Sequence, residues 1–155
     1  MDASEGSEAY ARHASLRDLD LAKRKLVTEG LSLAIVKLGK TLFTSRVPGI
    51  AGLTDAIRKS GPSLEGASVA DKVVGKAAAL LCVYAKISSV YARVMSELGL
   101  QVLEKFSIHF EHDTLVPNIL DRDGTKMCPF ESLVLRIDSP ERAFLAIDRR
   151  LATKV

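Results

Sequence analysis

Apolar residues recur at helical spacing in the first clearly patterned segment, residues 15–30. Ser15 and Asp18 resemble a capping box at its start, and Gly30 suits its end. The repeat predicts an amphipathic helix with a buried stripe, formed by Leu16, Leu19, Ala22 and Leu26.

The spacing of apolar residues changes directly after residue 30. Residues 31–38 are apolar at nearly every position, which predicts a strand covered on both faces. Gly39-Lys40 predicts a two-residue turn of type II′, because glycine comes first, with residues 41–45 as the returning strand. The remaining pattern predicts helices over 47–61, 67–82, 97–106, 129–137 and 140–152, and strands over 86–96 and 107–112.

This order of elements predicts the fold class. Helices alternate with strands after an initial hairpin, which is typical of a three-layer α/β/α arrangement around a mixed sheet. An antiparallel hairpin at the start argues against a Rossmann-type nucleotide fold. The absence of a G-x-G-x-x-G or P-loop motif argues against it too.

Composition narrows the class of protein. A length of 155 residues with 47% hydrophobic and 26% charged residues is ordinary for one globular domain, expected over 15–155. Residues 1–14 show no apolar periodicity and are expected to be a mobile tail. The net charge of +3 is spread along the chain, so no nucleic-acid partner is expected.

The same composition bears on the cellular compartment. The two cysteines are too few for a disulfide scaffold. The acidic, polar start of the chain is not a signal peptide, and no apolar run approaches the roughly 18 residues of a membrane span. We therefore expect a cytoplasmic protein with no membrane partner.

The segment ASVADKVVGKAAALLC, residues 67–82, contains unusual residues for the start of a buried helix. Asp71 is suited to cap that helix, either itself or with Ser68. Gly75 costs helix stability, and the small residues on its face, Ala78, Ala79 and Cys82, allow close approach of a backbone, a second subunit or a ligand. Capping does not explain Lys72 and Lys76, which lie unfavourably near the positive end of the helix.

A second unusual segment is GTKMCPFESLVL. If Pro129 is the first helical residue, Cys128 is the N-cap and Glu131 is the third residue. A thiol at a helix N-terminus is stabilised as thiolate, which suits a nucleophile or a metal ligand, although Glu131 opposes this by adding negative charge. The alternative for Cys128 is a small buried apolar residue.

DKVVGKAAALL together with CPFE resembles a bacterial family of domains of unknown function with a cytidine-deaminase-like fold, over about residues 16–137. The resemblance implies that two helix N-termini face one pocket. It implies that five residues lie close together: Asp71, Lys72, Gly75, Cys128 and Glu131. Two positive helix ends that meet favour an anionic or polar ligand.

The chain departs from zinc deaminases, whose signature is H-x-E followed by P-C-x-x-C. Asp71 lies near the first ligand position, and Val73 replaces the catalytic Glu. Cys128 and Glu131 keep the second spacing, but a carboxylate replaces the second thiolate. A site of Asp71, Cys128 and Glu131 could bind a metal weakly. We nevertheless expect no resident metal or other cofactor, and no ordinary hydrolytic deamination.

Three functions remain from the sequence. The first is a module that binds a small polar or nucleotide-like ligand, with charge from Lys72 and Lys76 and close approach at Gly75. The second is an enzyme in which Cys128 is the nucleophile and Asp71 or Glu131 the acid/base. The third is a homo-oligomer that packs through the small-residue helix face.

Overall fold

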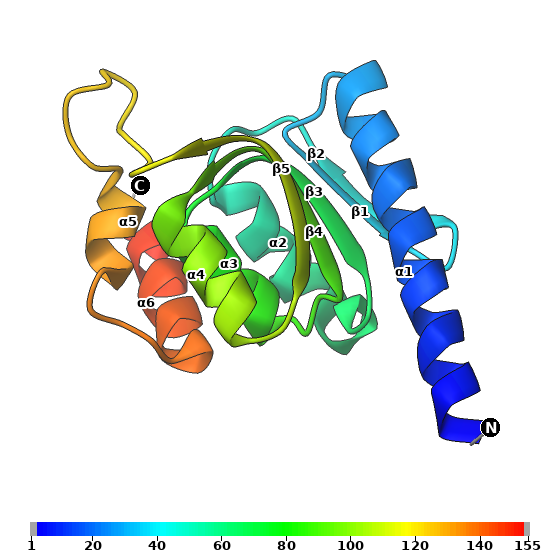
Figure 1. Cartoon of the computed structure of the whole chain (residues 1–155). Coiled ribbons are helices and arrows are strands. Elements are labelled where there is room, and N and C mark those ends of the chain that lie inside the picture. The colour runs from blue at the N-terminus through cyan, green and yellow to red at the C-terminus, as the bar shows by residue number, and fades with distance from the viewer. Residues whose placement is uncertain (1–2, 154–155) are drawn as a thin grey trace.

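The computed structural model describes residues 3–153 as a five-stranded mixed sheet with helices on both faces (Figure 1). The strands are β1 (Leu33–Lys37), β2 (Lys40–Ser45), β3 (Ser68–Val74), β4 (Ser89–Ser96) and β5 (His109–Val116). The helices are α1 (Ala3–Thr28), α2 (Ala51–Ser60), the short 3-10 helix η1 (Gly61–Leu64), α3 (Lys76–Tyr84), α4 (Glu97–Lys105), α5 (Pro129–Val134) and α6 (Pro140–Ala152).

The sheet has the order β2-β1-β3-β4-β5. The first three strands in this order pair antiparallel, whereas β3, β4 and β5 are parallel. The predicted hairpin and the later crossover connections are therefore both present. The predicted fold class, a three-layer α/β/α arrangement with a mixed sheet, is confirmed.

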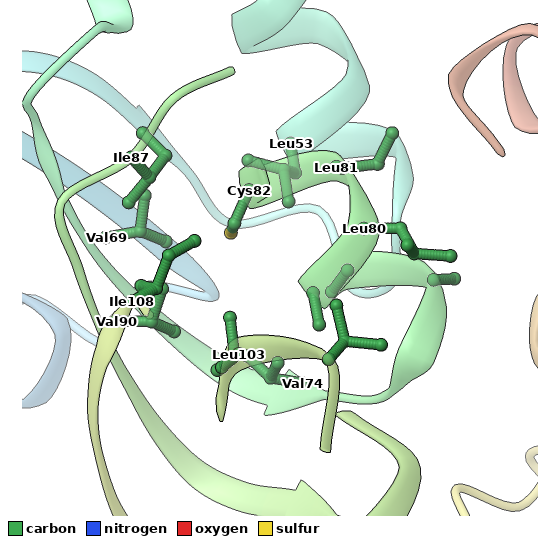
Figure 2. Close-up of a cluster of buried hydrophobic side chains, with 14 of the residues drawn as sticks. Leu53, Val69, Val74, Leu80, Leu81, Cys82, Ile87, Val90, Leu103 and Ile108 are labelled. Carbon is green, nitrogen blue, oxygen red and sulfur yellow. The ribbon is translucent and has the colours of Figure 1, made fainter. Parts of the chain in front are cut away.

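Two apolar clusters separate the three layers. On one face α1 packs alone, burying its predicted stripe of Leu19, Ala22 and Leu26 against β1, β3 and β4. The other face carries the larger cluster beneath α2, α3 and α4, with α5 and α6 packed on α3. Figure 2 shows Cys82 of α3 inside this larger cluster, near Val69 and Val90 of the sheet.

Helix α1 begins earlier than its apolar pattern predicts. It starts at Ala3, so residues 3–14 form its first turns and the predicted start at Ser15 is wrong. Ser15 instead bonds to Ser88, just before β4, at 2.8 Å and to Ser89, the first residue of β4, at 3.0 Å. Residues 1 and 2 of the expected tail lie outside the described part, and its mobility stays a prediction.

The hairpin turn is also shifted by one residue from its predicted position. Lys37 pairs with Lys40, so Leu38 and Gly39 form the turn, with φ of 50° and 77°. Two positive φ values define a type I′ turn, not the predicted type II′. Asp18 accepts hydrogen bonds from both turn amides, at 2.8 and 2.9 Å, which fixes the hairpin to α1.

The segment 67–82 contains a strand as well as the predicted helix. Ser68 to Val74 form β3 in the interior of the sheet, and α3 begins only at Lys76. The predicted cap at Ser68 or Asp71 is therefore wrong. The predicted helix starts at Pro129 and Pro140 are correct, and Ser96 caps α4 through Gly99 N as its position suggests.

None of the helices in residues 3–153 is both long enough and apolar enough to span a membrane.

Candidate functional site

The two unusual segments meet where the side chain of Glu131 lies against the start of α3. Gly75 is the N-cap of α3 and has no side chain to accept the free amides of the first turn. Glu131, from α5, accepts these bonds instead: Oε1 from Lys76 N at 2.7 Å and Oε2 from Ala77 N at 2.8 Å. A carboxylate also complements the positive end of the helix dipole.

The carboxyl group of Glu131 is buried as well as hydrogen-bonded, and its burial affects its pKa. Glu131 is only 5% exposed. Burial raises the pKa of its carboxyl, whereas the two amide bonds and the nearby Lys76 lower it and so favour the charged form. The start of α3 is thus occupied by a carboxyl group that the chain itself supplies.

Gly75 is required by this arrangement because of space. A Cβ built on Gly75 would lie 2.0 Å from Glu131 Oε1 and 2.4 Å from its Cδ. On the other side, a Cβ on Gly99 of α4 would lie 2.9 Å from the carbonyl carbon and oxygen of Gly75. Two glycines therefore allow Glu131 and α4 to pack directly on the backbone that begins α3.

Lys76 makes a second link between the same elements. Its side chain is largely buried and its Nζ lies 3.0 Å from Leu135 O and 3.1 Å from Asp138 Oδ1. Lys76 thus donates to a carbonyl just after α5 while Glu131 of α5 accepts from the start of α3. This explains a lysine near a positive helix end, because its charge is directed away from that end.

Cys128 is the N-cap of α5, as its position before Pro129 predicts. Its thiol makes no capping hydrogen bond and is partly exposed. Cys82, in contrast, is fully buried in α3. Burial raises the pKa of the Cys82 thiol far above its usual range, and the nearby charge of Asp71 raises it further.

Asp71 and Lys72 are not part of the cluster at the start of α3. Asp71 is in β3, where its Oδ1 accepts a bond from Val73 N at 3.1 Å. Burial raises the pKa of Asp71 to about 7, against the opposing effect of amide bonds from Val73 and Lys72. Lys72 is exposed in β3 and makes no contact with this cluster among the hydrogen bonds of residues 3–153.

The positions of Asp71, Cys128 and Glu131 decide whether these side chains can hold a metal ion together. Among residues 3–153 no three or more His, Cys, Asp or Glu side chains are grouped to hold an ion. Asp71, Cys128 and Glu131 therefore do not form a zinc site, and both oxygens of Glu131 already bind amides. The donors present do not fit the zinc of a deaminase.

The structure brings together Gly75, Lys76 and Glu131, with Cys128 at the start of the same short helix α5. The sequence analysis missed Gly99 and Asp138, which complete the packing around this contact. Gly99 gives a weak signal, since a glycine inside a predicted helix marks a close approach. Asp138 has no such signal, because its partner is 62 residues away.

Comparison with known proteins identifies the family of this chain. The family model described as a domain of unknown function (DUF1893) matches residues 21–151. The chain belongs to the DUF1893 family. The resemblance drawn from its two motifs is therefore confirmed at the level of the family.

The solved structure of a family member agrees with this membership. A DUF1893 family protein from Thermotoga maritima is 32% identical, with a TM-score of 0.79 over 88% of this chain and 89% of that one. RibD from Acinetobacter baumannii is 18% identical, with a TM-score of 0.46 over 66% of this chain and 35% of that one. The dCMP deaminase of cyanophage S-TIM5 is 20% identical, with a TM-score of 0.44 over 72% and 99%. A search of curated proteins found no match.

Proposed function

We propose that this DUF1893 chain is a binding module for a small polar or nucleotide-like ligand and does not carry out zinc-dependent deamination. The observation that carries the proposal is the carboxylate of Glu131 bonded to the amides of Lys76 and Ala77. It occupies the helix start at which the sequence resemblance would place reaction chemistry.

The same contact refines the comparison with the deaminase signature. Gly75, not Asp71, faces the residue that replaces the second thiolate. If position 75 corresponds to the first ligand, position 77 corresponds to the proton-carrying Glu of H-x-E. Neither position can serve that chemistry here, since Gly75 offers no ligand atom and Ala77 no group that carries a proton, and a carboxylate, Glu131, stands in place of the second thiolate.

The ligand must therefore bind elsewhere than at the start of α3. Glu131 already satisfies the amides there, and Lys76 is bonded to Leu135 and Asp138. The expected roles of Lys76 in ligand charge and of Gly75 in ligand approach are replaced by contacts within the chain. Lys72 remains exposed in β3.

The sequence feature that suggested a homo-oligomer, a face of small residues on α3, is buried within the single chain. The small residues of α3, Ala78, Ala79 and Cys82, are all at most 4% exposed within a single chain. Their face packs against the sheet and neighbouring helices and is not available to a second subunit.

The proposal is tested by measuring melting temperature and ammonia release with a panel of nucleosides, nucleotides and amino acids. We expect at least one compound to raise the melting temperature, because a ligand bound only to the folded state stabilises it, and no compound to release ammonia. Ammonia release that depends on this chain contradicts the proposal. A melting temperature that depends on protein concentration and on no compound would favour the oligomer instead.

The alternative of a Cys128 enzyme makes a different prediction. A catalytic thiol needs a base within hydrogen-bond reach, whereas Glu131 is committed to α3 and Asp71 belongs to β3. We expect iodoacetamide to modify Cys128 at the rate of an ordinary free thiol, measured by mass spectrometry. Cys82 is the buried control and should react only on unfolding. Much faster modification of Cys128 would restore the enzyme hypothesis.

A further inference from the structure

A cavity of about 550 Å³ lies between α1 and the starts of β4 and β5. We name it the α1 cleft. Its volume falls in the range of about 300–1,000 Å³ that is usual for small-molecule sites. Its polar lining consists of Arg12, Ser15, Ser88, Ser107 and His109.

A network of serine hydroxyls fixes the walls of the α1 cleft. Ser15 of α1 bonds to Ser88 at 2.8 Å and to Ser89 at 3.0 Å. Ser89 in turn lies 2.6 Å from Ser68, which donates to Ser15 O at 2.9 Å. Because Ser68 and Ser89 are fully buried, α1 is held at a fixed distance from the strands and the cleft is preformed.

The donors that remain free are suited to an anion. Arg12 makes no ion pair with any residue in 3–153, and no carboxylate lines the cleft. His109 Nε2 has one acidic neighbour, Glu111 Oε1 at 3.6 Å, which is beyond a hydrogen bond. The protons of Ser15 and Ser88 are already engaged within the chain, so Arg12, His109 and Ser107 supply the available donors.

The backbone conformation of Ser107 is a separate observation on the α1 cleft. It follows α4 with a φ of 57°, a conformation that favours glycine. Ile108 N bonds to Leu103 O at 2.9 Å and Ser107 N to Glu104 O at 3.1 Å, as at a helix end closed by a left-handed residue. A serine is unfavourable there for stability, and its side chain is exposed. It borders the cleft.

We propose that the α1 cleft binds a small organic phosphate, with the phosphate on Arg12, Ser107 and His109. The guanidinium provides several charge-assisted hydrogen bonds in a geometry that matches phosphate oxygens. The apolar side chains of Leu16 and Ile108 line the same cavity and contact the organic part of the ligand. This inference rests on the proposed function, because it gives the ligand of that function a binding site. The site is separate from the start of α3, so the measurement of zinc content does not bear on it.

The test is a titration of the full chain with cytidine monophosphate, inorganic phosphate and cytidine, followed by calorimetry and by amide NMR shifts. We expect cytidine monophosphate to bind saturably, with the largest shifts at Ser88, Ser107 and His109. Arg12→Ala should weaken binding at least about tenfold. Arg17→Ala is the matched control, an exposed arginine of the same helix outside the cleft, and should bind as the parent protein does.

A second variant separates binding from folding. Ser107→Gly relieves the left-handed conformation, so we expect a higher melting temperature together with weaker phosphate binding. The proposal is overturned if none of the probes binds, if cytidine binds as well as its phosphate, or if Arg12→Ala and Arg17→Ala behave alike. Shifts centred on Gly75 and Glu131 would overturn it as well and would place the ligand at α3.

Discussion

Glu131 accounts for the unusual residues at the start of α3. Its carboxylate caps the helix from another element, so the N-cap itself needs no side chain and has no room for one. Lys76 is tolerated near the positive helix end because its Nζ reaches Leu135 O and Asp138. Gly75 and Lys76, which seemed suited to a ligand, are therefore both engaged by contacts within the chain.

Gly75→Ala tests this contact. The added Cβ would lie 2.0 Å from Glu131 Oε1, so the carboxylate must move from its amides. We expect a loss of about 2 to 3 kcal/mol in the free energy of unfolding, measured by urea denaturation. Gly6→Ala is the control, because nothing lies within 4 Å of a Cβ there and it should leave stability unchanged or slightly raised.

A double variant checks the mechanism of that loss. With Glu131→Ala the obstacle to a side chain at position 75 is removed, so the two substitutions should be clearly non-additive. Additive losses would mean that Gly75 and Glu131 do not act through each other.

Asp71 makes stability depend on pH. Its pKa in the folded chain is raised from 3.8 to about 7, so the folded state keeps a proton that the unfolded state loses. The stability this proton confers is complete below the unfolded pKa and is lost as pH rises through about 7.

Asp71→Asn removes that titration and keeps the acceptor for Val73 N. We therefore expect it to stabilise the chain relative to the parent protein at pH 8 by about 4 kcal/mol more than at pH 4. Urea denaturation of both proteins at the two pH values measures the difference, and other titrating groups cancel in the comparison. Equal effects at both pH values would show that Asp71 titrates normally.

At the scale of elements, local pattern predicted most of the architecture and failed at specific places. Proline at the first helical position correctly placed the starts of α5 and α6. Strand β3 was read as helix because Ser68 and Asp71 imitate a capping box. The β-branched Val69, Val73 and Val74 before Gly75 were the signal for a strand.

The early turns of α1 show a second kind of failure. Residues 4–13 are exposed, so they carry no apolar stripe for periodicity to detect. Alanine and glutamate occur repeatedly there, and their helix propensity was the available signal. Exposed helix is thus found from propensity, whereas buried helix is found from periodicity.

The hairpin turn offers a test at this scale. Leu38 occupies the first turn position with φ of 50° and is 69% exposed, where a type I′ turn favours asparagine. We expect Leu38→Asn to raise the free energy of unfolding by about 0.5 to 1 kcal/mol. Leu145→Asn, at a 60% exposed helical position, is the control and should not stabilise. A destabilising Leu38→Asn would argue against the type I′ turn.

For the whole molecule, the order of elements was sufficient to predict an α/β/α fold with a mixed sheet. The candidate site was predictable only in part. The meeting of α3 with α5 follows from the resemblance, but the direct bond between Glu131 and the α3 amides joins residues 54 and 55 positions apart. No local pattern specifies which side chain fills that space.

The central claim is that this chain closes the start of α3 with its own carboxylate and leaves no zinc site there. The most direct measurement is the zinc content of protein purified and dialysed with zinc in the buffer, read by inductively coupled plasma mass spectrometry. We expect no stoichiometric zinc, since no group of ligands in residues 3–153 can hold it. Zinc bound stoichiometrically, and lost in both Glu131→Gln and Cys128→Ser, would contradict the account.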